Sequence, residues 1–439
     1  MFSKILVANR GEIAIRIIRS CKEMGISTVS VYSEADKDSM HTALADECIC
    51  IGNATPADSY LNAERIISAA LASGAQAIHP GYGFLSESAK LADLCEKHGI
   101  SFIGPPSAII AKLGDKDTAR SIMHDAGVPT IPGSATIADP AIAAETAEKL
   151  GFPLMIKARA GGGGRGIRQV NAADEFHNAF KIASREASEA FGDGALYLEK
   201  MIYPAKHIEV QILADEFGNT VCLMERECSI QRNNQKLSEE SPSPAVDDDL
   251  REKLFSAAKA AAKAVGYVNA GTIEFLLDAN GDFYFMEMNV RLQVEHAVTE
   301  QVTGIDLVKW QIRIAAGVPL DFEQDSVASS GHSIECRINA SSVGTVEFLH
   351  VPGGPQVRFD SALWTGYAIP PYYDSLLGKL IVHAATREEA IRKMRAALCE
   401  LVIDGVPNNI DEQISIISDE RFRTGEYYTN FCEVQDNGI

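Results

Sequence analysis

Short apolar runs alternate with amphipathic stretches along the N-terminal part of the chain. The apolar runs have the length and composition of buried strands and occupy residues 5–8, 28–32 and 75–79. Residues 12–24 and 60–71 carry apolar positions three and four apart, which predicts helices, and Gly25 ends the first. Strands alternating with helices indicate a parallel sheet covered on both faces. The Pro-Gly-Tyr-Gly segment at 80–83 lies at a strand's carboxyl end, where open α/β sheets bind ligands.

The pattern then predicts a small unit followed by a strand-rich stretch. The small unit covers residues 141–203 and contains helices, the strands 153–158 and 195–200, and a run of glycines between those strands. The strand-rich stretch continues to about residue 288 and is interrupted by a helix over 249–265, which Gly266 ends.

The composition changes again near residues 321–331. From there to residue 439 the pattern predicts a smaller mixed domain. We expect this domain to end in a helix over 388–401, followed only by a short tail.

The clearest local signal is a hairpin around Asn280-Gly281. This dipeptide lies between two runs of β-type residues, and a two-residue turn of this kind sets the register of both strands. With Ala279 opposite Asp282, Glu274 falls directly opposite Glu287. The Cβ atoms of such a pair lie about 5 Å apart.

Two opposed carboxylates on one hairpin face indicate a cation site. Like charges directly opposite each other are destabilising unless water or a cation separates them. Asn289 lies one step further on this face, and carboxylate and amide oxygens suit Mg²⁺ or Mn²⁺. A solvated face is the alternative, but Leu276 and Phe285 share this face, which favours the metal. The opposite, core-facing side carries Ile273, Phe275, Leu277, Tyr284, Met286 and Met288.

The residues after the hairpin continue the same face if the chain stays extended. They are Arg291, Gln293 and Glu295. An arginine fork suits an oxyanion such as bicarbonate or phosphate, and a nearby glutamate suits a general base. A surface ion pair is the alternative, and the adjacent metal residues favour the functional interpretation.

A glycine run, residues 161–164 and 166, follows the strand that contains Lys157. It is not a Walker motif, because no Gly-Lys-Ser/Thr follows, and a flexible linker is the alternative. Its position between two strands predicts a lid whose backbone N–H groups close on phosphates, with Lys157 adding a positive charge. Glu199, next to Lys200 at a strand end, is a weaker candidate for accepting a hydrogen bond from an adenine amino group.

Three other charged residues have ordinary alternatives. Lys116 suits the start of a helix, Lys236 suits a solvated loop, and Arg337 suits a cross-strand ion pair.

Composition excludes several classes of function. Sixty acidic and 40 basic residues give a net charge of −20, which argues against nucleic acid as a partner, although local lysines still suffice for ATP. No apolar stretch of about 18 residues occurs, so no membrane span is expected. The first apolar run ends at Asn9-Arg10, which favours a strand over a signal peptide. Nine scattered cysteines without a CxxC pair suggest reduced thiols in a cytoplasmic protein.

Together the motifs resemble the biotin carboxylase component of biotin-dependent carboxylases such as acetyl-CoA carboxylase, within the ATP-grasp superfamily. They run in family order over nearly the whole chain, which is far more specific than any single motif. They are Ile-Leu-Val-Ala-Asn-Arg-Gly-Glu-Ile-Ala near the start, the segment 79–87, Gly114-Asp-Lys116, Lys157 with the glycine run, 225–232, Glu287-Met-Asn289, 291–296 and 370–375.

The resemblance implies an α/β fold of three domains. These are an N-terminal Rossmann-like parallel-sheet domain over 1–112, an ATP-grasp domain over 113–325 with a mobile glycine-rich lid at about 130–203, and a mixed α+β C-terminal domain over 326–439.

The resemblance also implies a reaction and roles for individual residues. ATP phosphorylates bicarbonate to carboxyphosphate, which delivers CO₂ to a ureido nitrogen of biotin. The matches to metal-binding residues are Glu274, Glu287 and Asn289. Those around ATP are Lys116, Lys157, Gly163, Gly164, Glu199, Lys200, Ile202, His207, Gln231, Asn234 and Leu276. Lys236, Arg291, Gln293 and Val294 match bicarbonate-binding residues, Glu295 matches the base that deprotonates bicarbonate, and Arg337 matches the residue that steadies the biotin enolate.

The expected partners also follow from the resemblance. The sequence contains no Met-Lys-Met biotinylation motif and no carboxyltransferase region. We therefore expect a subunit that serves a biotin carboxyl carrier protein and separate carboxyltransferase subunits, as in fatty acid biosynthesis. Family members often form homodimers, and Arg19 and Glu23 match residues at that interface.

The chain departs from the family pattern in two places. Asn233-Asn234 replaces an Arg-His pair whose histidine contacts the nucleotide, so ATP is expected to bind more weakly. The run 340–351 is shorter than its family counterpart and dissimilar from it, because the chain lacks a Pro- and Gly-containing segment that is common in the family at this place. Two other functions remain open, an ATP-grasp carboxylate–amine ligase and a nucleotide-binding scaffold subunit without turnover.

Overall fold

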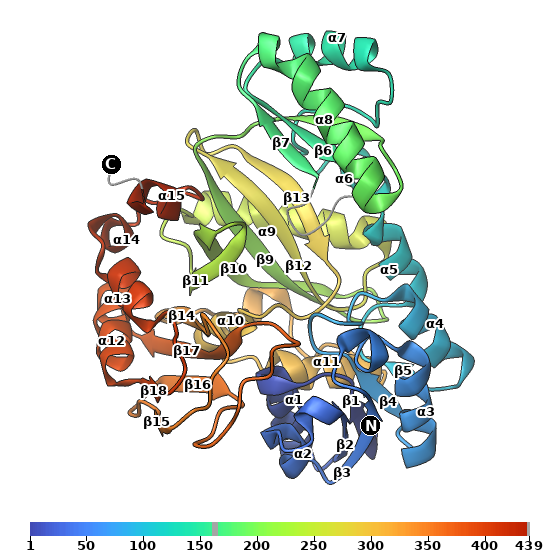
Figure 1. Cartoon of the computed structure of the whole chain (residues 1–439), viewed down its shortest axis with the longest axis vertical. Coiled ribbons are helices and arrows are strands. Elements are labelled where there is room, and N and C mark those ends of the chain that lie inside the picture. The colour runs from blue at the N-terminus through green and yellow to red at the C-terminus, as the bar shows by residue number, and fades with distance from the viewer. Residues whose placement is uncertain (160–165, 437–439) are drawn as a thin grey trace.

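The computed structural model describes residues 1–159 and 166–436 (Figure 1). The glycines predicted to form the lid, including Gly163 and Gly164, lie outside these residues, apart from Gly166. Among the described residues, no helix combines the length and apolarity needed to cross a bilayer.

The N-terminal region is a five-stranded parallel sheet with the strand order β3-β2-β1-β4-β5, which confirms the predicted parallel sheet. Its strands are β1 (Lys4–Val7), β2 (Ser27–Ser33), β3 (Glu47–Gly52), β4 (Ala77–His79) and β5 (Ser101–Phe102). Its helices are α1 (Gly11–Glu23), α2 (Met40–Leu44), α3 (Ala63–Ser73) and α4 (Ala89–Lys97). The helix predicted over 60–71 starts at Ala63, because Asn62 caps it and Tyr60 is buried before it.

A small unit with its own core stands apart at the top of Figure 1. Helices α5 (Ser107–Gly114) and α6 (Lys116–Asp125) lead to it. It consists of α7 (Pro140–Leu150), β6 (Leu154–Ala158), β7 (Ile167–Val170), α8 (Ala173–Phe191) and β8 (Leu196–Lys200). The three strands form a sheet in the order β7-β6-β8, so Lys157 and Glu199 lie on neighbouring strands.

The largest sheet has eight antiparallel strands in the order β13-β12-β9-β10-β11-β14-β17-β16. They are β9 (Ala205–Ala214), β10 (Thr220–Arg232), β11 (Gln235–Ser241), β12 (Asn269–Asp278), β13 (Phe283–Asn289), β14 (His332–Asn339), β16 (Val357–Ser361) and β17 (Leu376–Ala384). The pairing of β11 with β14 carries the sheet across the boundary that we placed at residue 325.

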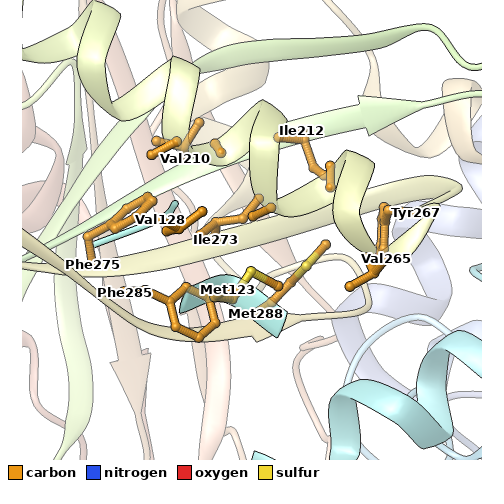
Figure 2. Packing of buried hydrophobic residues seen from close by; sticks show 14 of the residues in the cluster. Met123, Val128, Val210, Ile212, Val265, Tyr267, Ile273, Phe275, Phe285 and Met288 are labelled. Atoms are coloured by element: carbon orange, nitrogen blue, oxygen red, sulfur yellow. The ribbon is translucent and has the colours of Figure 1, made fainter. Parts of the chain in front are cut away.

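The helix predicted over 249–265 forms as α9 (Asp248–Val265), and it covers one face of this sheet. Asp247 caps its start, and Gly266 ends it with a left-handed backbone at φ 64°. Figure 2 shows the core beneath it, where Val210, Ile273 and Phe285 come from three strands of the sheet. The helices α10 (His296–Thr303) and α11 (Leu307–Ala315) follow β13 in the chain.

The end of the chain contradicts the predicted short tail. After α12 (Arg387–Glu400) come β18 (Val402–Asp404), α13 (Ile410–Ser418), α14 (Glu420–Thr424) and α15 (Phe431–Asp436). Phe422, Tyr427 and Phe431 are buried in the C-terminal core, so this segment is held by packing that a scan of local patterns does not detect. The shortened segment 340–351 contains β15 (Phe348–His350), which pairs with β18.

The predicted hairpin forms, but not with a two-residue turn. The N–H of Asp278 donates to the carbonyl of Asp282, which leaves three loop residues, and Gly281 takes φ 86°. Ala279 therefore does not pair with Asp282. A bulge between Phe285 and Glu287 then adds one residue and restores the predicted pairing of Glu274 with Glu287.

The bulge also changes which side chains face the core. Phe285 was predicted on the carboxylate face, but it is buried in the core beside Phe275. Tyr284 and Met286 were predicted in the core, and both remain partly exposed. The alternation assumed from the sequence fails here because a bulge shifts the side-chain period by one residue.

Candidate active site

A row of four charged residues crosses the large sheet. Backbone pairing aligns Arg226 of β10 with Glu209 of β9, Glu209 with Glu274 of β12, and Glu274 with Glu287 of β13. Arg226 is fully buried and donates to Glu209, Gln211, Thr272 and Thr299. Glu209 and Glu274 are buried, and two aligned buried carboxylates require compensating positive charge, of which one arginine at the end of the row supplies only part.

Lys236, from β11, supplies the second positive charge. Its Nζ lies 2.7 Å from Glu209, 3.1 Å from Glu274 and 2.6 Å from Glu295. Burial alone lowers the pKa of Lys236, but the three carboxylates outweigh burial and raise this pKa well above its usual value. The solvated loop considered for Lys236 is therefore wrong, since the side chain is the centre of a buried charge cluster.

The two opposed carboxylates of the hairpin differ in their surroundings. Glu274 is buried and accepts from Lys236, Asn289 and Gln293, while His207 Nε2 lies 3.0 Å from its second oxygen. Burial raises the pKa of Glu274, but Lys236 and His207 reverse this and keep the pKa below its usual value.

Glu287 is the open member of the pair. Its side chain is 45% exposed, and the nearest ammonium, that of Lys116, is 3.9 Å away. Partial burial and the negative charge of Glu274 raise the pKa of Glu287. The raised pKa shows that the negative charge of Glu287 is not fully compensated by the surrounding residues. A hard divalent cation would compensate it, and the two carboxylates and the Asn289 amide offer the oxygen ligands that such a cation prefers.

The segment after β13 does not meet the condition of staying extended, because β13 ends at Asn289 and residues 290–295 bend toward α10. The predicted side chains nevertheless converge. Gln293 donates to Glu274 at 2.9 Å, and Arg291 donates to Gln293 at 2.8 Å and to Asn289 at 3.1 Å. Arg291 Nε also lies 3.3 Å from Glu87, so its guanidinium is held on three sides.

Glu295 and Arg337 form the second buried charge cluster. Glu295 lies 2.6 Å from Lys236 and 3.0 Å from Arg337, whose Nε also donates to Glu239 at 2.6 Å. Burial raises the pKa of Glu295, but Lys236 and Arg337 outweigh it and hold this pKa well below the usual value. The cross-strand ion pair considered as the ordinary alternative for Arg337 therefore exists. It is buried, however, and it includes Glu295, the candidate general base.

Glu239 makes the stability of the chain depend on pH. Burial, together with the charge of Glu295, raises the pKa of Glu239 to about 7 despite Arg337. The folded chain therefore keeps a proton that the unfolded chain releases near pH 4.5, and stability is lost as pH rises toward 7. We expect the stability of wild type relative to Glu239→Gln to fall between about pH 5 and pH 7, by at most about 1.4 kcal/mol per pH unit. Urea unfolding of both proteins across this range measures it, and parallel curves would contradict it.

The candidate nucleotide residues are divided between the small unit and the large sheet. Lys157 of β6 pairs with Glu199 of β8. Lys200 is the last residue of β8, and its Nζ lies 3.5 Å from the carbonyl oxygen of Phe152. His207 and Leu276 are partners on β9 and β12, and Gln231 Nε2 lies 2.8 Å from Nδ1 of His207. Ile202 lies between β8 and β9 and is partly buried.

Asn233 and Asn234 form the exposed turn between β10 and β11. Arg232 pairs with Gln235, so the loop has two residues, with φ 53° and 61°. Positive φ at both central positions is typical of the type I′ turn, whose twist matches that of the flanking strands, and asparagine tolerates positive φ. The asparagine pair therefore has a local structural reason, and Asn234 is exposed at the tip.

Four residues of the site were missed in the sequence. They are Glu87, Glu209, Arg226 and Glu239. Glu209 and Gln211 alternate with apolar residues along a strand, which was the available signal. Glu239 gave no such signal, because Glu240 adjoins it and faces the other side, toward His332 and Arg387.

Three family descriptions match consecutive parts of the chain. "Biotin carboxylase, N-terminal domain" matches residues 1–110, "Carbamoyl-phosphate synthase L chain, ATP binding domain" matches 115–323, and "Biotin carboxylase C-terminal domain" matches 335–434. The fold and the site define an ATP-dependent ligase of the ATP-grasp superfamily. Within that class, the chain belongs to the biotin carboxylase family.

Full-length relatives agree with this assignment. Biotin carboxylase 1 of Bacillus subtilis is 51% identical over 446 residues, covering 99% of both chains. The crystal structure of a biotin carboxylase–β-γ-ATP complex from Campylobacter jejuni is 47% identical, with a TM-score of 0.96 and 99% coverage of both chains. The biotin carboxylase domain of Hydrogenobacter thermophilus 2-oxoglutarate carboxylase, in complex with MgADP, ADP and bicarbonate, is 50% identical, with a TM-score of 0.95 and coverage of 100% and 98%.

Proposed function

We propose that this chain carboxylates biotin on a carrier protein, using ATP and bicarbonate. The observation that carries the proposal is the convergence of Lys236, Arg291, Gln293 and Glu295 beside the carboxylates Glu274 and Glu287. Such a cluster joins an oxyanion site to a cation site, as phosphorylation of bicarbonate requires. The relative from Hydrogenobacter thermophilus that binds MgADP and bicarbonate supports it.

The proposed roles follow from charge and position. Lys236 and Arg291, with Gln293 and the backbone of Val294, hold bicarbonate while its oxygen attacks the γ-phosphorus of ATP and displaces ADP. Glu295 takes the bicarbonate proton. In the free site Lys236 and Arg337 hold Glu295 ionised, and a bound anion that draws on these cations raises the pKa of Glu295 and strengthens it as a base.

The second step transfers the carboxyl group. Carboxyphosphate releases CO₂ and phosphate, the released phosphate takes the N–H proton of the biotin ureido group, and the ureido nitrogen then attacks the CO₂. Arg337 faces the site from β14 and offers positive charge to the enolate oxygen that develops on biotin. Glu239 fixes the direction of this guanidinium through its contact with Nε.

The nucleotide and the metal are assigned to the neighbouring residues. We propose that Glu274, Glu287 and Asn289 hold Mg²⁺ or Mn²⁺, which supplies positive charge to the phosphoryl oxygens when bound. The residues proposed around ATP are Lys116, Lys157, Glu199, Lys200, Ile202, His207, Gln231, Asn234 and Leu276, with Gly163 and Gly164 in the lid.

The domain boundaries and the assembly are also proposals. We place domains at 1–112, 113–325 and 326–439, and expect a homodimer in which Arg19 takes part. Arg19 is exposed on α1, whereas Glu23 is already paired with Lys309 of its own chain. The proposed partners are a biotin carboxyl carrier protein and a carboxyltransferase. Fatty acid biosynthesis through acetyl-CoA carboxylase is the role we favour, and the acceptor is chosen outside this chain.

Steady-state kinetics test the proposed function. We expect ATP hydrolysis that requires bicarbonate and Mg²⁺ or Mn²⁺ and is stimulated by free biotin, because biotin consumes CO₂ at Arg337. Heat-treated enzyme and omission of bicarbonate are the controls. Hydrolysis that ignores biotin but responds to an amino acid would instead establish a carboxylate–amine ligase, and absence of hydrolysis in the folded protein would favour a scaffold subunit.

A further inference from the structure

A buried lysine of the C-terminal region reaches the segment that carries the candidate bicarbonate residues. Lys379, in β17, is fully buried, and its Nζ lies 2.7 Å from the backbone carbonyl oxygen of Val294. Val294 stands between Gln293, which donates to Glu274, and Glu295, which pairs with Lys236. A shift of this one carbonyl group therefore moves two site residues.

The second partner of Lys379 comes from the N-terminal region. Glu12, in the first turn of α1, is buried and places Oε1 3.2 Å from Nζ of Lys379. The hydroxyl of Tyr82 donates to the same oxygen, and its ring centre lies 5.9 Å from Nζ. Tyr82 belongs to the loop at 80–83 that the sequence pattern associated with ligand binding. This loop thus meets the site through Glu12 and Lys379.

The large sheet holds Lys379 beside another site residue. Its backbone pairs with Arg337 on β14 and with Asp360 on β16. Arg337 contacts Glu295 while Lys379 contacts Val294, so two adjacent strands hold two consecutive residues of the bent segment. Three regions of the chain, those of Glu12, Val294 and Lys379, meet at one ammonium group.

The charge of Lys379 is maintained although the side chain is buried. Burial alone lowers the pKa of Lys379, but Glu12, Glu335 and Asp360 outweigh it and raise the pKa. Buried ion pairs contribute little net stability relative to apolar side chains of similar volume, and their best-attested use is to fix one arrangement. A lysine that donates to a carbonyl inside the candidate site suits that use.

We propose that Lys379 is a positioning residue for bicarbonate, which fixes the carbonyl of Val294 and thereby the relative placement of Gln293 and Glu295. It contacts no reacting atom and acts only through this backbone segment. The inference rests on the proposed function of the site, and its test includes a measurement that does not depend on activity.

The first test compares Lys379→Met with wild type in the ATP hydrolysis assay. We expect the KM for bicarbonate to rise about 10- to 100-fold, since small misplacements near reacting groups have effects of this size. The KM for ATP should change less than about twofold, because the residues proposed to surround ATP do not lie on β17 or on the segment that Lys379 holds. Lys393→Met is the matched control. Lys393 also donates to a backbone carbonyl, that of His383 at 2.7 Å, but this carbonyl lies near the C-terminal end of β17.

A second variant guards against misfolding. Lys379→Met leaves the Glu12 carboxylate without its cation, and the double variant Lys379→Met with Glu12→Gln removes both charges. The double variant is expected to fold and still to show the raised KM for bicarbonate. A wild-type KM in the folded double variant, or an equal rise in the KM for ATP, overturns the proposal.

Amide hydrogen exchange of residues 290–296 supplies the measurement independent of turnover. We expect faster exchange of this peptide in Lys379→Met than in wild type and Lys393→Met. Unchanged exchange overturns the positioning role. If wild type shows no bicarbonate-dependent hydrolysis, the proposed function fails, and the exchange result still decides whether Lys379 holds this segment.

Discussion

Replacing Lys236 with methionine is expected to lower the free energy of unfolding by about 3–5 kcal/mol, the usual effect of removing one partner from a buried ion pair. The ammonium of Lys236 contacts Glu209, Glu274 and Glu295, all of them buried. Without it, Arg226 still pairs with Glu209 and Arg337 with Glu295, but Glu274 keeps only neutral donors and His207. Turnover is expected to fall about 10²- to 10³-fold, because a cation facing the oxyanion is lost.

The destabilisation should depend on pH in a defined direction. Lys236 holds the pKa values of Glu274 and Glu295 below their usual range, so the variant's carboxylates take up protons at higher pH than in wild type. Protonation relieves the unpaired charge, and the deficit in stability should therefore shrink as pH falls from 8 toward about 5.

A matched control separates charge from the loss of a buried lysine. Lys206 is also buried, but its nearest acceptors are the backbone carbonyls of Gly425 and Tyr427. Lys206→Met should cost about 1–3 kcal/mol with a weaker dependence on pH. Guanidinium unfolding of both variants between pH 5 and pH 8 makes the comparison. Equal, pH-independent losses would show that Lys236 does not compensate the negative charge of the three carboxylates.

The hairpin shows how far local patterns predict this site. The sequence predicted that Glu274 faces Glu287, and the structure confirms the pairing although the assumed turn is wrong. A three-residue loop shifts the register by one residue, and the bulge before Glu287 shifts it back. Neither event leaves a clear local signature, because the same residues are compatible with a two-residue turn.

The charge clusters show what local patterns do not predict. Lys236 follows an exposed turn in the sequence and therefore resembles a solvated residue, yet β11 directs it onto three carboxylates from β9, β12 and the bent segment. Glu209 and Glu239 lie on strands that local patterns can predict, but such patterns do not predict which strands are neighbours in the sheet. The resemblance to a family supplied what periodicity did not, namely which distant residues share one site.

Glu287→Gln is expected to abolish turnover without destabilising the metal-free protein. The pKa of Glu287 is raised by partial burial and by Glu274, so its ionised form is disfavoured in the folded chain. A group of this kind opposes folding above its raised pKa and has no effect once protonated, so the variant should equal or exceed wild type in stability at pH 8 and match it near pH 4. Turnover should fall more than about 100-fold, since loss of mere supporting contacts to a metal ligand already costs 10- to 100-fold.

The control for this variant is Asp282→Asn, which removes an exposed carboxylate from the turn of the same hairpin and should leave turnover unchanged. Thermal unfolding with EDTA, and again with Mg²⁺ and ATP, separates the two roles of Glu287. Wild type and Asp282→Asn should gain stability from Mg²⁺ and ATP, whereas Glu287→Gln should gain less, because stabilisation follows affinity for the folded state. A clear loss of stability of Glu287→Gln in EDTA would instead mean that the opposed carboxylates are a structural pair, held by Lys116 and their hydrogen bonds rather than by a cation.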